Sequence, residues 1–242
     1  TLNGQVKIGD WGAYTSPLKI NKTIIAGDSI ICATEGGLLI KSGDIYNTLT
    51  TIDGLYSVDL STAEKDSFGN FWIGGSTPLG FIQIYNFNIG SVEVFDFGLT
   101  KIIDIYIDSV NAYVAFIDGQ DVGIVKFVYS NDKWSYRDIY RNFPVAVNEI
   151  NGLEILQTTL SSEKNIFLAT NAGLFLGKIS TNLKDPNNWQ RGFCCFDDGS
   201  IKAMTRYQNG IAFIFDENDN DPAKVYYIYP SEESYLYENL DI

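Results

Sequence analysis

Histidine is absent from this chain of 242 residues, which also has only three cysteines. Without histidine the sequence lacks the usual general base near neutral pH, the Ser-His-Asp and Cys-His catalytic sets, and the ligands of HExxH zinc sites. Cys32, Cys194 and Cys195 are too few for a structural zinc site, which needs about four ligands. We therefore expect a protein that is not an enzyme and has no cofactor, apart from a calcium candidate considered below.

Long apolar runs and basic clusters are missing as well. No segment approaches the roughly 18 apolar residues of a membrane-spanning helix, so we expect no membrane insertion. The 17 basic and 30 acidic residues give a net charge of −13. This charge repels nucleic-acid phosphates, so we expect no nucleic-acid partner. An acidic surface is compatible with a secreted protein, although it also simply aids solubility, which is the interpretation that the charge alone favours.

What the chain does contain is a repeated β-rich phrase. Each copy has a run of β-branched and aromatic residues, a tight polar turn, and a second run that ends in glycine and bulky apolar residues. Five copies align on the first apolar residue after the turn, namely Ile30, Phe71, Tyr113, Ile166 and Ile211. Their intervals of 41 to 53 residues are near the roughly 40–50 residues of a four-stranded propeller blade. No amphipathic helix of about ten residues or more interrupts this strand pattern.

The repeat predicts an all-β fold, a β-propeller of about five four-stranded blades that forms a single domain. The blades are expected at 17–56, 57–100, 101–147, 148–200 and 201–242. Segment 6–16 is expected to be an outer strand that closes the ring. Rings of six to eight blades are commoner than rings of five. Two alternatives therefore stay open: the chain closes a ring by itself, or it is part of a larger propeller.

Asparagine and glycine mark the expected turns. Asn151–Gly152 and Asn209–Gly210 are pairs typical of two-residue hairpins, because both residue types tolerate a positive φ. Gly27 and Gly69 occupy equivalent points in the first two copies. We predict tight turns at all four places.

Three motifs resemble known propeller sequences. D-S-F-G-N-F-W-I-G-G (66–75) is similar to the D-x-x-G-N-L-W-I-G-T signature of the two-component-regulator-type propeller repeat, and C-A-T-E-G-G-L-L-I (32–40) to its adjoining segment. G-D-W-G-A-Y-T-S (9–16) resembles the N-terminal propeller of secreted proteins linked to type IX secretion. The resemblance covers about the first 100 residues. It implies an extracytoplasmic binding or scaffold module without a catalytic residue, in which Trp72 packs between blades.

The densest acidic segment, F-D-E-N-D-N-D-P, is a candidate calcium site. Asp216, Asn218, Asn220 and Asp221 offer the alternating oxygen ligands that Ca²⁺ prefers. The segment departs from an EF-hand loop, because Asp221 replaces the turn glycine and Tyr227 replaces the bidentate glutamate. A solvated hairpin tip is the alternative interpretation.

An aromatic-rich run, W-S-Y-R-D-I-Y-R-N-F, is a candidate binding surface. Its proposed contact residues are Trp134, Tyr136, Arg137 and Arg141. Tyrosine and tryptophan combine apolar area with a polar tip, which suits a protein or glycan partner. Packing of the same aromatic residues between blades is the alternative. A second polar cluster, Asp118, Gln120 and Asp121, is expected to be a hairpin connection.

The leading hypothesis is a non-catalytic binding or assembly module, extracellular or on the cell surface of a bacterium. Its partner is expected to be a protein, a glycan or, by self-association, a second copy. One alternative is the periplasmic sensor propeller of a membrane-bound two-component regulator, and another is a carbohydrate-active enzyme. Glycosidases need two carboxylates about 5–10 Å apart. The sequence does not place Glu35, Asp104 and Asp118 relative to one another.

Overall fold

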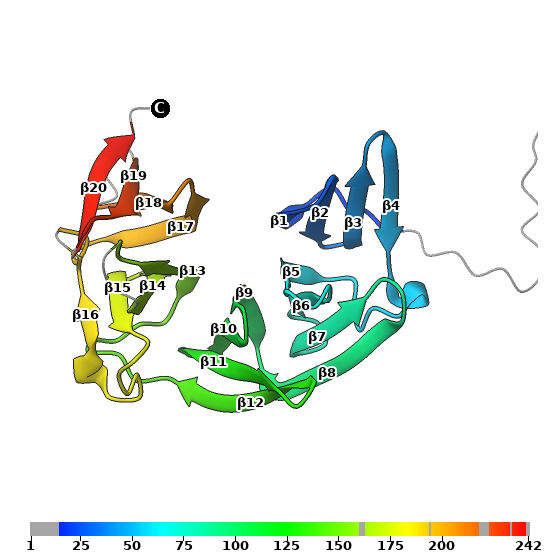
Figure 1. Ribbon diagram of the computed structural model, residues 1–242, viewed down its shortest axis with the longest axis horizontal. Helices are drawn as coiled ribbons and strands as arrows, with labels where there is room; N and C mark the ends of the chain where they lie inside the picture. The colour runs from blue at the N-terminus through cyan, green and yellow to red at the C-terminus, as the bar shows by residue number, and fades with distance from the viewer. Residues whose placement is uncertain (1–14, 160–162, 194, 218–222, 233, 241–242) are drawn as a thin grey trace, which may run out of the picture.

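The protein is a β-propeller of five blades. The computed structural model describes residues 15–159, 163–193, 195–217, 223–232 and 234–240. Their strands form five four-stranded antiparallel sheets, and each strand pairs with the next one along the chain. The sheets stand side by side around a common axis, with the first strand of each sheet innermost (Figure 1). The predicted all-β propeller is confirmed.

Each blade is a simple meander. Blade 1 consists of β1 (Ile20–Ala26), β2 (Ser29–Thr34), β3 (Gly37–Ser42) and β4 (Ile45–Leu49). Blade 2 consists of β5 (Leu60–Lys65), β6 (Phe71–Gly75), β7 (Gly80–Asn86) and β8 (Gly90–Leu99). Blade 3 consists of β9 (Lys101–Asp108), β10 (Asn111–Asp118), β11 (Asp121–Ser130) and β12 (Lys133–Tyr140). Blade 4 consists of β13 (Ile150–Gln157), β14 (Lys164–Thr170), β15 (Gly173–Lys178) and β16 (Trp189–Arg191). Blade 5 consists of β17 (Ser200–Tyr207), β18 (Gly210–Asp216), β19 (Lys224–Pro230) and β20 (Tyr235–Leu240).

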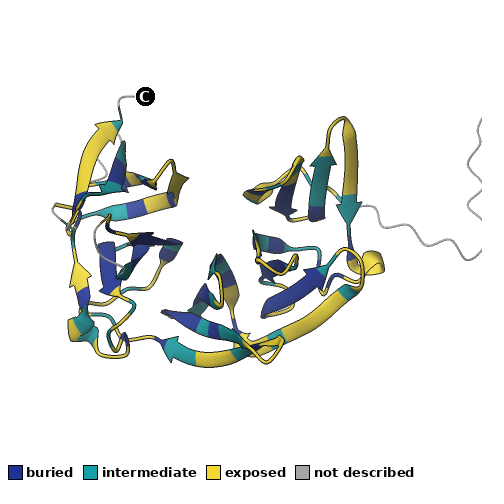
Figure 2. Cartoon of the chain, in the orientation of Figure 1, coloured by how far each residue is buried: buried dark blue, intermediate teal, exposed yellow. Residues whose placement is uncertain are grey.

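The hydrophobic core lies between the blades. Four clusters of buried side chains are found in the described residues, and each is built by two consecutive blades. Exposed residues concentrate instead on outer strands such as β4, β8 and β20 (Figure 2). A sheet cannot cover its own two faces, so each blade depends on its neighbours for burial.

Trp72 illustrates how two blades share one cluster. Its side chain is fully buried, and its ring meets Phe127 and Trp134 of blade 3 edge-on, with centroids 5.3 and 5.0 Å apart. Burying a side chain of this size contributes about 1.5–3 kcal/mol. The predicted position of Trp72 between blades is confirmed.

The D-S-F-G-N motif is explained by one carboxylate. Asp66 Oδ1 accepts hydrogen bonds from the backbone N–H groups of Phe68 and Asn70, at 2.9 and 2.8 Å. Oδ2 accepts from Asn70 Nδ2 at 3.0 Å and from Trp134 Nε1 of blade 3 at 3.1 Å. Gly69 takes a φ of 86°, which favours glycine. The motif therefore closes the turn and also ties blade 2 to blade 3.

Every innermost strand carries one extra residue, a β-bulge, near its start. The bulged residues are Asn21, Ser61, Ile103, Asn151 and Lys202. Three of them donate a side-chain hydrogen bond to a backbone carbonyl of the next blade: Asn21 to Leu60 at 2.7 Å, Ser61 to Ile102, and Asn151 to Ile201 at 2.9 Å. Ile103 has no donor to offer. We call this series the bulge ladder.

The bulge ladder also explains why one predicted turn is wrong. Asn151–Gly152 lies inside strand β13 and not in a hairpin. Asn151 is the bulged residue, and a Cβ added at Gly152 would lie 3.1 Å from Met204 Cβ of blade 5. Glycine is needed here because two blades approach each other closely at this point. The local sequence Asn-Gly looks the same in such a contact as it does in a tight turn.

The other predicted turns are found, one of them shifted. Gly27 and Gly69 lie in turns with positive φ values of 63° and 86°. In blade 5 the turn falls one residue earlier than predicted, at Gln208 and Asn209, and Gly210 begins β18. A Cβ at Gly210 would lie 2.0 Å from the carbonyl oxygen of Ile228, so this glycine is required by packing.

The arc of five blades is open. Within the described residues, no hydrophobic cluster joins blade 5 to blade 1, and a gap separates β1 from β17 (Figure 1). Most of the expected closing strand at 6–16 lies outside the described residues, and Thr15 and Ser16 belong to no strand.

Candidate functional site

A groove of about 1100 Å³ lies between blades 3 and 4. One wall is the turn that joins β10 to β11, and the other is the connection from β12 to β13, residues 141–149. Asp118 ends β10 and pairs with Asp121 at the start of β11, with Gly119 and Gln120 between them. The predicted hairpin at this cluster is therefore confirmed.

Arg141 is the cation of this groove. Its Nη1 donates to Asp118 Oδ2 at 2.9 Å, and its guanidinium lies 4.8 Å from the centre of the Phe116 ring. Both charged side chains are about a third exposed, so the pair contributes little stability, about 0–1 kcal/mol. Its effect is to fix the guanidinium in place at the wall of the groove.

The connection that forms the other wall is anchored at both ends. Phe143 packs against Phe175 and Trp189 of blade 4, with centroids 5.9 and 5.3 Å apart. Asn171 Oδ1 accepts from the backbone N–H groups of Asn148 and Glu149, at 3.3 and 3.2 Å. The wall is thus held by side-chain contacts, although it contains no strand.

The lining of the groove mixes polar and apolar groups. Amide and carboxylate side chains come from Gln120, Asp121, Asn142, Asn148 and Glu149, and apolar ones from Val145, Val147 and Pro186. Such a lining offers hydrogen bonds in several directions together with small apolar contacts. It can bind an extended polar ligand.

The structure disperses the four residues predicted as a binding surface. Trp134 is buried in the cluster between blades 2 and 3, so it is not on the surface. Tyr136 lies on the same face of blade 3 as Trp134 but is 49% exposed. Its ring centre lies 5.6 Å from that of Phe97. Arg137 is exposed on β12, and Arg141 lies in the groove. Binding through Tyr136, Arg137 and Arg141 stays a prediction.

The candidate calcium ligands Asn218, Asn220 and Asp221 lie outside the described residues. The fourth, Asp216, places Oδ2 3.2 Å from Lys202 Nζ. Across the described part of the chain, no group of three or more histidine, cysteine, aspartate or glutamate side chains could hold a metal ion. The calcium site stays a prediction.

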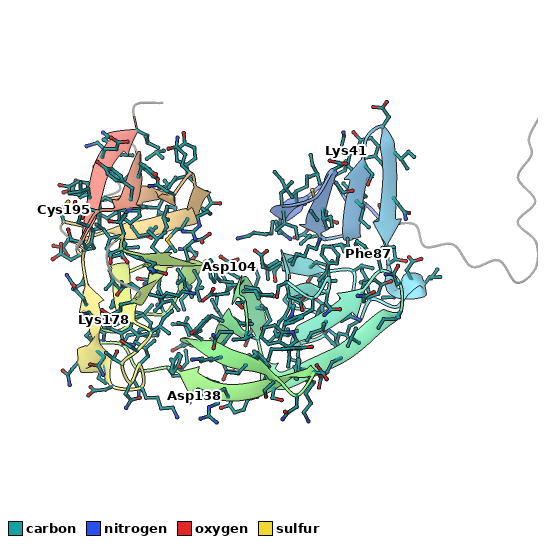
Figure 3. All side chains as sticks on the ribbon, viewed as in Figure 1. Lys41, Phe87, Asp104, Asp138, Lys178 and Cys195 are labelled. Atoms are coloured by element: carbon teal, nitrogen blue, oxygen red, sulfur yellow. The ribbon has the colours of Figure 1, made fainter. Side chains whose placement is uncertain are left out.

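A charged cluster on the propeller axis was not predicted from the sequence. Asp104, on β9, lies at the centre of the arc (Figure 3). Its carboxylate accepts from Lys22 Nζ of blade 1 at 2.9 Å and from Thr62 Oγ1 of blade 2 at 3.4 Å. It also accepts from the backbone N–H groups of Ile105 and of Leu153 in blade 4, at 3.0 and 3.1 Å. One buried carboxylate thus joins four blades.

Burial and the charges of neighbouring side chains shift the pKa values of the ionisable groups in this cluster. Burial lowers the pKa of Lys22, but the charge and hydrogen bond of Asp104, together with the charges of Glu154 and Glu64, outweigh it, so that the pKa of Lys22 is raised. Glu154, only 6% exposed, has its pKa raised to about 7 by burial and by the charge of Asp104, against the opposing charges of Lys22 and Arg206. Burial also raises the pKa of Glu64. Glu154 Oε2 has no hydrogen-bond partner among the described residues.

A second contact across the axis comes from blade 5. Arg206 Nη2 donates to the Tyr106 hydroxyl at 3.2 Å, and this hydroxyl donates to the Ile155 carbonyl at 3.3 Å. Lys22 and Arg206 therefore reach blade 3 from the two ends of the arc. The sequence carried one signal for this cluster, since Asp104 interrupts the apolar strand I-I-D-I-Y-I.

The three carboxylates considered for glycoside chemistry are each engaged by a different cation. The pairs are Lys19 with Glu35, Lys22 with Asp104, and Arg141 with Asp118. A nucleophile or general acid must be available to the substrate. Asp104 is buried within the axial cluster, so its carboxylate is engaged in joining blades.

Comparisons with known proteins support the fold. No family model matches the chain, and no curated protein matches it significantly. Among solved structures it is similar to PorZ, an essential bacterial surface component of the type IX secretion system of Porphyromonas gingivalis, with a TM-score of 0.61 and 16% identity over 90% of this chain and 27% of that one. It is also similar to the extracellular domain of the hybrid two-component system BT4673 from B. thetaiotaomicron, with a TM-score of 0.59 and 18% identity over 91% and 27%. A third is the WD40 propeller domain of Doa1, with a TM-score of 0.55 and 12% identity over 90% and 70%.

These likenesses establish the propeller architecture. The chain spans about a quarter of the length of the PorZ and BT4673 chains. The resemblance to propellers of the type IX secretion and two-component kinds, predicted from three motifs, is confirmed for the fold. In the described parts of the chain, no helix is long and apolar enough to cross a membrane.

Proposed function

We propose that this protein is a non-catalytic binding or assembly module that acts outside the bacterial cytoplasm, secreted or at the cell surface. The observation that carries the proposal is the groove between blades 3 and 4, whose walls are anchored to both blades and whose lining mixes polar and apolar groups. Similarity to a surface component of a secretion system and to the extracellular domain of a sensor supports the location.

The ligand that best suits this groove is an extended segment of another protein. Arg141 has donors beyond the one directed at Asp118, and a guanidinium presents them in a planar fork that matches carboxylates and carbonyls. Val145, Val147 and Pro186 offer contacts for small apolar side chains. A polar glycan is the alternative ligand, because the same amides and carboxylates can bind sugar hydroxyls.

Arg141→Ala tests the groove directly. The purified protein is applied to an array of extracellular peptides and to a glycan array, and the best binder is titrated. We expect the variant to lose at least tenfold in affinity for a peptide. Lys133→Ala is the control, since it removes an exposed cation from the neighbouring strand β12 and should bind as the unsubstituted protein does. Equal binding by both variants, or no binder on either array, contradicts the proposal.

A second candidate function is the input domain of a membrane-bound sensor. The observation that favours it is the similarity to the BT4673 extracellular domain, which is nearly as high as that to PorZ. The complete gene separates the two functions. A membrane helix followed by a kinase-like domain supports the sensor, whereas a sorting domain supports secretion or surface display.

A further inference from the structure

A separate pocket of about 470 Å³ lies between blades 4 and 5. It is found at the opposite end of the strands from the groove: Glu149 of the groove precedes β13, whereas Thr158 of the pocket follows it. Blade 4 supplies one wall, and blade 5 supplies Tyr235 at the start of β20. We call this cavity the blade 4–5 pocket.

The face of blade 4 that packs on blade 5 becomes polar where it reaches the pocket. Leu156, Phe167 and Leu176 of this face belong to the hydrophobic cluster shared with blade 5. Asn165 lies two residues before Phe167 on β14, so strand alternation places it on the same face. Asn165 and Thr158 are only 6% and 7% exposed. The pocket is therefore lined by polar side chains that the fold itself buries, and buried polar groups need hydrogen-bond partners.

A chain of hydrogen bonds fixes the orientation of the Asn165 amide. The Leu156 carbonyl can only accept, so the Tyr235 hydroxyl donates its one hydrogen to it, at 3.2 Å. Burial raises the pKa of Tyr235, so this hydrogen stays in place at neutral pH. The Tyr235 oxygen then accepts from Asn165 Nδ2 at 2.7 Å. Oδ1 of the same amide faces away from Tyr235, and no hydrogen bond among the described residues engages it. The pocket thus offers a buried acceptor to a ligand that brings a donor.

The charged groups of the pocket are more acidic than basic. Lys178 Nζ lies 3.0 Å from Glu163 Oε2, and Ser180 Oγ donates to Glu163 Oε1 at 2.6 Å. The hydrogen bonds from Ser180 and Lys178 lower the pKa of Glu163, so its carboxylate stays charged. Glu232 is exposed at the rim and has no ion-pair partner in the part of the chain that the structure describes. Glu163 and Glu232 against Lys178 leave one negative charge uncompensated.

An apolar wall completes the pocket. The half-buried Phe193 ring meets the Tyr235 ring edge-on, with centroids 6.1 Å apart, and Leu176 lines the same cavity. An aromatic ring gives apolar contact and also attracts a cation to its face. The pocket therefore matches a ligand with N–H donors, a positive charge and a short apolar part.

We propose that the blade 4–5 pocket binds a small organic amine, a primary ammonium ion on a short alkyl chain. The ammonium group donates to Asn165 Oδ1, the carboxylates of the rim compensate its charge, and the alkyl chain packs on Phe193 and Leu176. An anion would be repelled by Glu232, and a neutral polyol would leave the charge uncompensated. This site goes beyond the proposed function, because it shares no residue with the groove.

Three probes of equal length test the chemistry of the ligand: pentylamine, 1-pentanol and pentanoate, each titrated into the purified protein and followed by ligand-observed NMR. We expect pentylamine to bind about tenfold more tightly than 1-pentanol, because a hydrogen bond that involves a charged group is the stronger one. Pentanoate should not bind. Glucose is included as a neutral polyol and should bind more weakly than pentylamine.

Two variants locate the binding. Asn165→Leu removes the buried acceptor and should weaken pentylamine binding about tenfold. Glu232→Gln should weaken it about threefold, because water screens a charge at the rim. Glu93→Gln, an exposed glutamate on β8, is the matched control and should leave binding unchanged. Glu232→Gln also covers the case in which Asn165→Leu does not fold, because Glu232 is exposed and accepts no buried hydrogen bond.

Four results overturn the proposal. They are the absence of pentylamine binding, binding of 1-pentanol as tight as that of pentylamine, tighter binding of glucose, and pentylamine binding that Glu232→Gln weakens no more than Glu93→Gln does. The last result would show that the amine is held by the general negative charge of the protein.

Discussion

Blade 3 and blade 5 are built from the same four-stranded meander, yet they differ in what surrounds them. Blade 3 contributes to two core clusters and receives Lys22 and Arg206 across the axis. Blade 5 contributes to one cluster and exposes Tyr207, Ile214 and Leu236 on its other face. The comparison shows that strand pairing sets the shape of a blade, whereas its neighbours supply most of the burial that stabilises it.

The largest expected effect of a single change is in the cluster between blades 2 and 3. Phe127 is fully buried, with its ring 5.3 Å from Trp72 and 4.9 Å from Phe95. Phe127→Ala should lower the free energy of unfolding by about 3–5 kcal/mol, because it leaves a cavity. Urea denaturation measures this change. Ile214→Ala, on the more exposed face of blade 5, should lower it by only about 1 kcal/mol, because the side chain is 37% exposed. Similar losses from the two variants would contradict the comparison.

The next effect concerns the charge that joins four blades. Asp104→Ala removes the acceptor for Lys22 and for two backbone N–H groups. Breaking a buried ion pair costs roughly 3–5 kcal/mol. Lys22 is a quarter exposed, so we expect the lower end of that range in thermal or urea unfolding. Asp138→Ala is the control, since its partner Lys184 is half exposed. A loss no greater than that of the control would show that the axial cluster is dispensable.

Glu154 makes the stability of the axis depend on pH. Its folded pKa of about 7 lies above the unfolded value of about 4.3. The folded state therefore favours the protonated form, and the stability it contributes is complete below about pH 4.3 and is lost as the pH rises through about 7. Glu154→Gln should raise the free energy of unfolding at pH 8 by roughly 3 kcal/mol relative to the unsubstituted protein, with little difference at pH 4.

Unfolding of both proteins by urea at several pH values between 4 and 8 provides the measurement. Glu35→Gln is the control for general charge effects, since the side chain of Glu35 is 45% exposed. A Glu154→Gln variant with the same stability difference at every pH would contradict a raised pKa at this position.

The smallest expected effect comes from a comparison of two neighbouring residues of β1 whose side chains lie on opposite faces of blade 1. Ile25→Ser should change the free energy of unfolding of the 242-residue chain by about 0.5 kcal/mol or less, because the side chain is 80% exposed. Ile24→Ser, one residue away and buried, should lower it by about 2–4 kcal/mol. Equal losses would mean that both faces of blade 1 are covered in the 242-residue chain.

The sequence predicts the repeat well because each blade is a local meander. The alternation of apolar and polar residues along neighbouring strands is sufficient to predict five blades. The position of Trp72 between blades follows from the motif that contains it. Asn151–Gly152 shows the limit, because the close approach of Gly152 to Met204 depends on a different blade. Trp134 shows it again: whether an aromatic residue covers a neighbour or faces solvent depends on which blade stands beside it.

The site was harder to predict than the fold for the same reason. Lys22 and Asp104 are 82 residues apart in the chain, and only the curvature of the arc brings them within 2.9 Å. The groove likewise joins a turn of blade 3 to residues of blade 4, including Pro186 of the polar loop before β16. Arg141 could be singled out from the sequence as a binding candidate, but neither its pairing with Asp118 nor its place in a groove could be derived.

The direction of the bulge ladder has a consequence for how the protein is made. A chain leaves the ribosome from its N-terminus, so each blade is complete before the next one emerges. Asn21, Ser61 and Asn151 are then already in place as donors when Leu60, Ile102 and Ile201 of the following blade arrive. Blades 2, 3 and 5 can each add to a preformed apolar face and take their register from one waiting hydrogen bond.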